Sequence, residues 1–353
     1  MSFSRTLVLA ALALGVLAPA TLAAAPLLVT PYAPPADAWC EVRAEWTESL
    51  LAAHPAGAWA PLRFEPTDAQ LAKLGLPPRE ALQARRYPEP TLVTADGRAE
   101  AVGTPDPVVY AGPGCLGIRP GGLVLTLTGG AVAWCTLGHV YGAPGSYQVS
   151  TAGHCGNVGD VATVVAGFGT RGGVGGVVLL DIGRFARSTG DGGIGKDWAL
   201  IGVDARWQHL VSPTMCFWGG PLGVFTLQGD ALRVEPTVPP GVHADPALLQ
   251  TILRHGHGSG AGGPRVGEAL SWRAATYAYL GHIAPGDAGS PTLTLGGDEP
   301  GAQREAAGID THVLVDPSLR SGAGTILGTR VTLLGTPANG QFLPYPSPFP
   351  AGP

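Results

Sequence analysis

Short apolar runs bounded by glycine constrain the fold of residues 111–336 more than any other feature of the chain. The runs are rich in β-branched and aliphatic residues, as in "LVLTL", "VATVVAGFG", "VVLLDIGRFA" and "GVFTLQG". The 54 glycines of the chain separate such runs and form no repeat of fixed period. Short strands joined by frequent tight turns are typical of antiparallel barrels and sandwiches. The pattern therefore predicts an all-β unit, with one series of strands before "SPTM" at residues 212–215 and a second series after it.

The residues before about position 110 have a different pattern. Residues 36–53 place large apolar side chains at helical spacing, and residues 68–85 are helix-friendly apart from an interrupting "GLPP". The stretch that follows, residues 85–114, is rich in proline, glycine and polar residues. This composition is typical of a linker or of an extended arm that packs against the rest of the protein. We therefore predict an N-terminal helical extension and linker over residues 26–110, which is either a removable pro-segment or a permanent accessory element.

The two ends of the chain carry signals of their own. Residues 1–25 combine one arginine, an apolar run and a small-residue end at Ala23–Ala25, which indicates a secretory signal peptide. A transmembrane helix is disfavoured because Gly15 and Pro19 break the run and no basic flank follows it. We expect a secreted protein, extracellular, periplasmic or in the cell envelope, with no stable membrane span after signal cleavage. Residues 337–353 contain too many prolines for a strand and are expected to be extended or disordered.

The charge of the chain excludes several classes of partner. Charged residues make up 13% of the sequence and the formal net charge is −5. There is no basic surface to predict nucleic-acid binding and no acidic block to predict a disordered acidic tail. The sequence also has no phosphate-binding glycine loop of the form G-x-x-x-x-G-K. We therefore expect neither a nucleic-acid partner nor a cofactor, and the sequence leaves the oligomeric state open.

Three short motifs follow one another in the β-rich part of the chain. "STAGHC" ends at Cys155, "KDWALI" begins at Lys196, and "PGDAGSP" begins at Pro285. In this order they resemble the trypsin- and chymotrypsin-like serine proteases, whose base, orienting aspartate and nucleophile come in the order His, Asp, Ser. The resemblance covers roughly residues 111–336 and is carried by the combination of the motifs. It implies a chymotrypsin-like fold of two antiparallel six-stranded β-barrels.

The resemblance assigns a role to each matching position. His154 would be the general base, and Asp197 would hold its tautomer and stabilise the imidazolium. The backbone N–H groups of Gly286 and Ala288 would form the oxyanion hole, and Asp287 would be the buried carboxylate that organises the turn. Position 288, where the family has its nucleophilic serine, holds alanine. A methyl group cannot attack a carbonyl carbon, so the acyl-enzyme route is closed at this position.

Ser290 is an alternative source of a hydroxyl, two residues beyond the nucleophile position. We interpret it as structural, because a shift of two residues moves the side chain to another part of the strand entry. Members of the family with the motif G-D-S-G-S-P also carry this serine in addition to the nucleophile.

Five cysteines are expected to lie in an oxidising compartment, where disulfides persist. The resemblance implies a bridge from Cys155, which follows the base histidine, to Cys135 on the preceding strand. Cys40 with Cys115 is a possible second pair that would link the extension covalently to the barrels, and sequence alone does not set the connectivity. Cys216 would then be a buried free thiol.

The substrate pocket and the activation mechanism depart from the pattern of trypsin-like enzymes. The pocket floor of the family lies six residues before the nucleophile position, which is His282 here, so an acidic floor for arginine or lysine is absent. A plain strand-end histidine is an equally good interpretation of this residue. The segment "CLGIRPGGLVL" offers no I-V-G-G-like start, so activation by insertion of a free amine beside the turn aspartate is not expected.

The run "RHGHGSGAGG" at residues 254–263 raises the hypothesis of a metal site, because His255 and His257 are two residues apart. No third ligand at a suitable spacing is evident, and the glycines indicate a flexible loop. We therefore predict no metal site.

The sequence supports three functional hypotheses. The first is a secreted serine protease homologue that is catalytically inactive and acts by binding a peptide, protein or carbohydrate in the remnant cleft, because Ala288 lies in an otherwise preserved motif. The second is an active secreted serine endopeptidase, in which a rearranged turn brings another hydroxyl to His154. The third, a cell-envelope structural protein, is suggested by the helical extension and the proline-rich tail and ranks last.

Overall fold

The computed structural model describes residues 60–103, 116–128, 131–215, 217–225, 251–258, 263–272, 275–295, 304–315, 323–334 and 337–338. The predicted signal peptide, the helix predicted over residues 36–53, Cys40, Cys115, Cys216 and the tail from residue 339 lie outside the described residues. None of the described helices is long and apolar enough to span a membrane.

The first barrel is an antiparallel sheet whose two ends are joined by a bent strand. Its strands are β4 (Leu123–Thr128), β5 (Ala131–Thr136), β6 (Val140–Tyr141), β7 (Gln148–Thr151), β8 (Val161–Arg171), β9 (Val174–Ser188) and β10 (Ala199–Val203). The sheet order is β5-β4-β8-β9-β10-β7-β6. Residues 137–139 join β5 directly to β6, and the N–H of Gly138 donates to the carbonyl of Ser150 in β7 (2.6 Å). β5 and β6 therefore act as one strand, which pairs with β4 and with β7 and closes a barrel of six strands.

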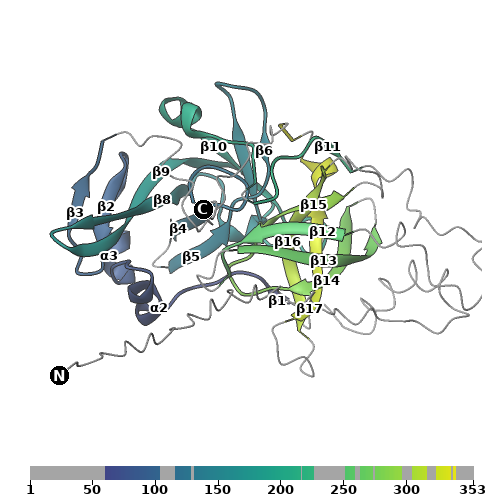
Figure 1. Ribbon diagram of the computed structural model, residues 1–353, viewed down its shortest axis with the longest axis horizontal. Coiled ribbons are helices and arrows are strands. Elements are labelled where there is room, and N and C mark those ends of the chain that lie inside the picture. Colours follow the sequence, from purple (N-terminus) through teal and green to yellow (C-terminus); the bar gives the residue numbers. More distant parts are fainter. Residues whose placement is uncertain are drawn as a thin grey trace, which may run out of the picture.

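The second barrel closes in the same strand order. Its strands are β12 (Thr251–Gly256), β13 (Gly263–Trp272), β14 (Thr276–His282), β15 (Pro291–Leu295), β16 (Arg304–Val315) and β17 (Ala323–Arg330). β16 pairs with both β15 and β17, which closes the ring, and the short β11 (Gly223–Val224) pairs with β16 in parallel. In each barrel the first strand lies between the second and the fourth, and the third pairs with the sixth. The predicted fold class, two antiparallel six-stranded barrels, is confirmed, and Figure 1 shows the teal first barrel beside the green and yellow second one.

Apolar side chains from the two barrels share one buried cluster. Its members include Val124, Val149, Leu180 and Ile201 from the first barrel and Ile252, Tyr279 and Ile326 from the second. Burying one such side chain contributes about 1.5–3 kcal/mol to the free energy of folding. The two barrels therefore form one packed unit.

The described part of the extension packs on the outside of the first barrel. Thr67 is the N-cap of α2 (Asp68–Lys73), and its side chain forms a capping box with Gln70. α3 (Arg79–Gln83) follows after the "GLPP" at residues 75–78, where the prolines cannot continue a helix. A second buried cluster joins this part of the chain to the barrel and includes Leu71, Leu82, Tyr87, Leu125, Trp134 and Leu179.

Part of residues 85–114, which were interpreted as a linker or a packed arm, forms a β-hairpin. β2 (Thr91–Thr94) pairs with β3 (Ala99–Ala101) and also with β9, where Thr91 lies opposite Leu179. The turn between the two strands contains Gly97 with φ of +82°, a conformation that favours glycine. The strands were missed because the apolar run "TLVT" is short and has prolines before it and glycines after it.

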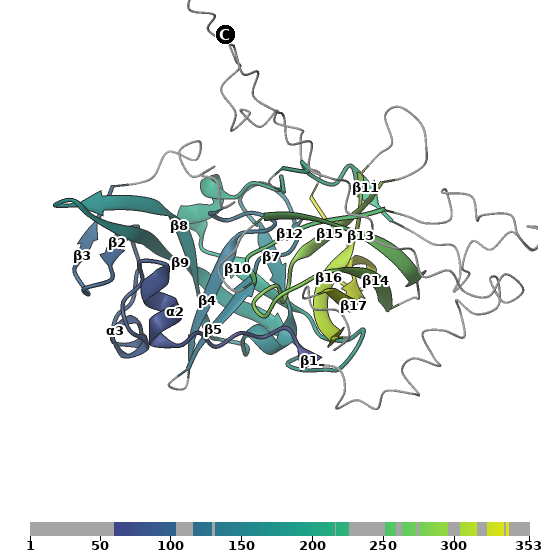
Figure 2. The same ribbon diagram turned by 60° about the horizontal axis from the view of Figure 1, so that its bottom comes forward.

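The extension also contacts the second barrel, through β1 (Ala60–Pro61). This strand pairs antiparallel with β16, where Ala60 lies opposite Val313. Figure 2 shows the dark-blue segment that follows β1 running from the second barrel to α2 beside the first. The segment therefore crosses the junction of the two barrels.

Candidate active site

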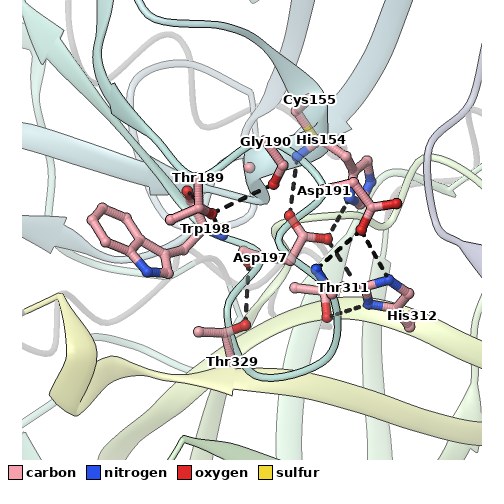
Figure 3. Close-up of polar contacts among 12 residues, drawn as sticks. His154, Cys155, Thr189, Gly190, Asp191, Asp197, Trp198, Thr311, His312 and Thr329 are labelled. Carbon is pink, nitrogen blue, oxygen red and sulfur yellow. Dashed lines mark hydrogen bonds and ion pairs between the residues drawn. The ribbon is translucent and has the colours of Figure 1, made fainter. Parts of the chain in front are cut away.

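His154 and Asp197 come together because the strands that flank them pair. His154 lies in a 3-10 turn (Gly153–Cys155) just after β7, and Asp197 lies just before β10. β7 and β10 are antiparallel, with Thr151 opposite Ala199. As a result His154 Nδ1 lies 2.5 Å from Asp197 Oδ2, and the backbone N–H of His154 donates to the other carboxylate oxygen (3.0 Å) (Figure 3). The carboxylate thus orients the ring and leaves Nε2 for chemistry.

A disulfide and two hydrogen bonds connect this pair to the turn that contains Ala288. Cys135 and Cys155 form the predicted bridge, with Cα atoms 6.2 Å apart. Thr136, next to Cys135, donates its N–H to the carbonyl of Ala288 (2.8 Å) and its hydroxyl to the carbonyl of Gly286 (3.0 Å). β5 therefore holds the turn of the second barrel against the part of the first barrel that carries the histidine.

Ala288 lies at the position that the resemblance assigns to the nucleophile. Its side chain is fully buried in the cluster shared by the barrels. Gly286 and Gly289 on either side have φ of +99° and +86°, so the turn favours glycine at both positions. His154 Nε2 is buried and makes no hydrogen bond within the described part of the chain. The histidine and aspartate predicted to be the base and its carboxylate lie together, but the turn offers no hydroxyl at position 288.

The side chain of Ser290 approaches β12 and Asp287. A Cβ placed on Gly256 would lie 2.4 Å from Ser290 Oγ and 2.2 Å from Asp287 Oδ1, so both side chains approach this glycine. The hydroxyl is buried and has no hydrogen-bond partner among the described residues. This position supports the interpretation of Ser290 as structural.

The carboxylate of Asp287 forms an ion pair with a buried arginine. Arg254 Nη2 lies 2.8 Å from Asp287 Oδ2, and the N–H groups of Gly258 (2.6 Å) and Ala284 (2.9 Å) also donate to the carboxylate. Burial alone would raise the pKa of Asp287, but the guanidinium and these donors outweigh burial and hold the pKa below its usual value. The arginine supplies the positive charge that an inserted amine would supply in trypsin-like enzymes.

The segment "RHGHG" differs from its predicted flexible loop. Arg254 and His255 lie in β12, and Arg254, His255 and His257 are 1%, 2% and 4% exposed. The prediction was wrong because it relied on the glycines, whereas residues 252–256 form a continuously buried part of a barrel strand. Burial lowers the pKa of His255 to about 3, with the neighbouring His257 and Arg254 adding to the effect, so this ring is neutral at physiological pH. Neither histidine belongs to a group of three possible metal ligands among the described residues.

His312, on β16, is a site residue that the sequence did not reveal. Its Nδ1 lies 3.8 Å from Asp197 Oδ2 and 2.9 Å from Thr311 Oγ1, and its Nε2 lies 3.6 Å from Asp191 Oδ1 (Figure 3). Burial lowers the pKa of His312. The residue stands in an apolar run with no motif around it, and only the approach of β16 to the first barrel places it beside the carboxylate.

Gly286 and Ala288 are the two residues whose N–H groups were predicted to form an oxyanion hole, and this role stays a prediction. The N–H of Gly286 donates to the carbonyl oxygen of Leu62 (2.6 Å), whereas the N–H of Ala288 donates to no described residue. His282 ends β14, and its carbonyl accepts a hydrogen bond from Arg254 Nη2 (2.5 Å). The place of the His282 ring at the floor of a specificity pocket stays a prediction.

No protein-family model and no curated protein matches the chain. Among solved structures, Thermobifida fusca protease A is 16% identical over 64% of this chain and 99% of that chain, with a TM-score of 0.36. The Nocardiopsis protease NAPase is 21% identical over 61% and 93% of the two chains, with a TM-score of 0.33. A glutamic acid specific serine protease, described as using a histidine triad in substrate binding, is 14% identical over 63% and 100%, with a TM-score of 0.38. These identities and TM-scores are low.

Proposed function

We propose that this protein is a secreted serine protease homologue of chymotrypsin-like fold that does not hydrolyse peptide bonds and acts by binding an extended peptide or protein segment. The observation that carries the proposal is Ala288 at the tight turn, beside a preserved His154–Asp197 pair. Removing the serine of a triad lowers turnover by roughly 10⁶-fold. The oxyanion hole and binding alone leave roughly 10³- to 10⁴-fold over the reaction in water, which is too little for a working protease.

Binding of an extended peptide is supported by the course of β16. A peptide can add a strand to a sheet edge and gains affinity from main-chain hydrogen bonds. β16 pairs with β15 as far as Ile309 and pairs with β17 along its other side up to Val315. Beyond Ile309, β15 has left this side of β16, and the edge can accept an added strand, as it accepts the short β1 at His312 and Val313.

Secretion is part of the proposal and is supported by the signal peptide predicted in residues 1–25. The Cys135–Cys155 disulfide fits an oxidising compartment, where such bridges persist.

An active serine endopeptidase is the alternative candidate. The 2.5 Å contact between His154 Nδ1 and Asp197 Oδ2 favours it, because an oriented base is a requirement of the reaction. This candidate needs a hydroxyl other than that of Ser290, whose side chain approaches β12.

Proteolysis is tested with the full-length protein, its Ala288→Ser variant and an Ala288→Ser/His154→Ala double variant. Each protein is treated with a fluorophosphonate probe and with fluorescent casein. We expect the natural protein to be inert in both assays. The serine variant should gain a reactive hydroxyl at position 288, because the base, the carboxylate and the turn are in place, and the double variant should lose that reactivity.

Labelling of any serine in the natural protein, or casein hydrolysis by the natural protein, would establish the endopeptidase and reject the proposal. A folded Ala288→Ser variant that is neither labelled nor cut at one of its own peptide bonds would show that the roles assigned to His154 and Asp197 are wrong.

A further inference from the structure

Residues 60–62 of the chain occupy the available side of β16. Ala60 lies opposite Val313 and Pro61 opposite His312 in an antiparallel register. The N–H of Leu62 continues the pairing and donates to the carbonyl of Thr311 (3.0 Å). Figures 1 and 2 place β1 beside the second barrel, whereas α2 lies beside the first. This short segment therefore adds a strand to the sheet edge in the way an extended peptide would.

The carbonyl of Leu62 is held at the turn that contains Ala288. It accepts the N–H of Gly286 at 2.6 Å, and that N–H is one of the two donors expected to stabilise a reacting carbonyl oxygen. The Leu62 side chain is 1% exposed and belongs to the same buried cluster as Ala288 and Val313. The peptide bond between Leu62 and Arg63 is thus placed where a bond to be cut would lie.

The segment then crosses to the first barrel. The N–H of Trp134 in β5 donates to the carbonyl of Phe64 (2.8 Å), and the two residues form an antiparallel bridge. The rings of Phe64 and Trp134 meet edge to face, with centroids 6.0 Å apart. Arg63, between the two anchored residues, lines a cavity of about 400 Å³ together with His154 and Asp191. Both barrels therefore bind the same five-residue strand, one on each side of the Leu62–Arg63 bond.

We infer that residues 60–64, Ala-Pro-Leu-Arg-Phe, are a built-in peptide ligand of the cleft, held in the register of a substrate with the Leu62–Arg63 bond at the reacting position. The segment stays intact because position 288 holds alanine, and in this respect the inference rests on the proposed function. An external ligand has to displace the segment and is an extended peptide with a leucine-like residue at the buried position. A tethered segment competes at an effective concentration of about millimolar, so it masks the cleft from weaker external ligands.

The Ala288→Ser variant tests the register through a reaction on its own chain. His154 Nε2 takes the proton of the new hydroxyl as Oγ bonds to the Leu62 carbonyl carbon, and the bond to the Arg63 nitrogen breaks as His154 returns the proton to that nitrogen. Water then hydrolyses the ester, which leaves a carboxylate on Leu62 and a free amine on Arg63. We expect N-terminal sequencing and intact mass to show a chain that begins at Arg63, absent from the natural protein and from the Ala288→Ser/His154→Ala variant.

A binding experiment tests the occupancy of the cleft without any reaction. A fluorescent acetyl-Ala-Pro-Leu-Arg-Phe-amide peptide is titrated by anisotropy into the natural protein and into full-length Leu62→Gly and Phe64→Ala variants, each of which weakens one anchor of the segment. We expect the peptide to bind the Leu62→Gly variant about 100-fold or more tightly than the natural protein, because the tethered competitor is weakened. Phe64→Ala gives the same direction of change if Leu62→Gly fails to fold, as judged by thermal unfolding.

The outcomes separate this inference from the proposed function. Equal peptide affinity for the natural protein and both variants, or cleavage of the serine variant at a bond other than Leu62–Arg63, overturns the inference. Either result leaves the proposed function standing, because that proposal rests on Ala288. Casein hydrolysis by the natural protein overturns the proposed function, whatever the peptide does.

Discussion

Arg254 and Asp287 form a buried ion pair beneath the turn that contains Ala288, with 2.8 Å between Nη2 and Oδ2 and side chains only 1% and 5% exposed. The same guanidinium lies 3.0 Å from Asp310 Oδ2, so one cation serves two carboxylates. Burial raises the pKa of Asp310 to about 6, although the arginine opposes this shift. The arginine therefore fixes the position of Asp287 within the turn.

Replacing Arg254 with methionine should lower the free energy of unfolding by about 3–5 kcal/mol, because it leaves a buried carboxylate without its partner. The matched control is Arg171→Met, which removes the arginine of an exposed pair with Glu100 (2.9 Å, side chains 40% and 52% exposed). The control should cost about 0–1 kcal/mol. Urea unfolding at pH 7 compares the two variants, and similar losses in both would contradict the role of the buried pair.

Removing the disulfide should also destabilise the protein, through the unfolded state. A Cys135→Ala/Cys155→Ala variant opens a loop with a sequence separation of 20 residues. In the chain-entropy account this costs about 3 kcal/mol in the free energy of unfolding. Thermal and urea unfolding of the variant measure the loss. The natural protein in a strong reductant serves as the control, since it should approach the stability of the variant, and no change in either sample would contradict the prediction.

The barrels and part of the site were predictable because contiguous residues carry them. Glycine-bounded apolar runs specify strands locally, and the closing order follows once those strands pair. His154 and Asp197 each lie in a motif of their own. The Cys135–Cys155 bridge followed from the resemblance, because the family joins the cysteine after the base histidine to one on the preceding strand.

Contacts between distant segments were not predictable from the sequence. Arg254 lies 33 residues before Asp287, in a glycine-rich run that indicates a loop until the barrel closes around it. His312 reaches Asp197 only because β16 passes along the first barrel. Leu62 belongs to no motif, and its hydrogen bond with Gly286 depends on how the extension crosses both barrels. Each of these residues acquires its role through tertiary packing.

Stability should fall as the pH drops from about 6.5 to 4, in part because of His139. This ring is fully buried, its Nε2 lies 3.1 Å from the carbonyl oxygen of Thr292, and burial lowers its pKa from 6.5 to about 4. Between these values the unfolded chain binds a proton that the folded chain does not, so acid favours unfolding, by up to about 3 kcal/mol from this group. A His139→Gln variant, which keeps a donor for Thr292 without titrating, should show a flatter dependence of unfolding free energy on pH, measured in urea at pH 7.5, 5.5 and 4.5. Replacing the exposed His209 with glutamine provides the control, and parallel curves for the natural protein and the His139→Gln variant would show that His139 makes no such contribution.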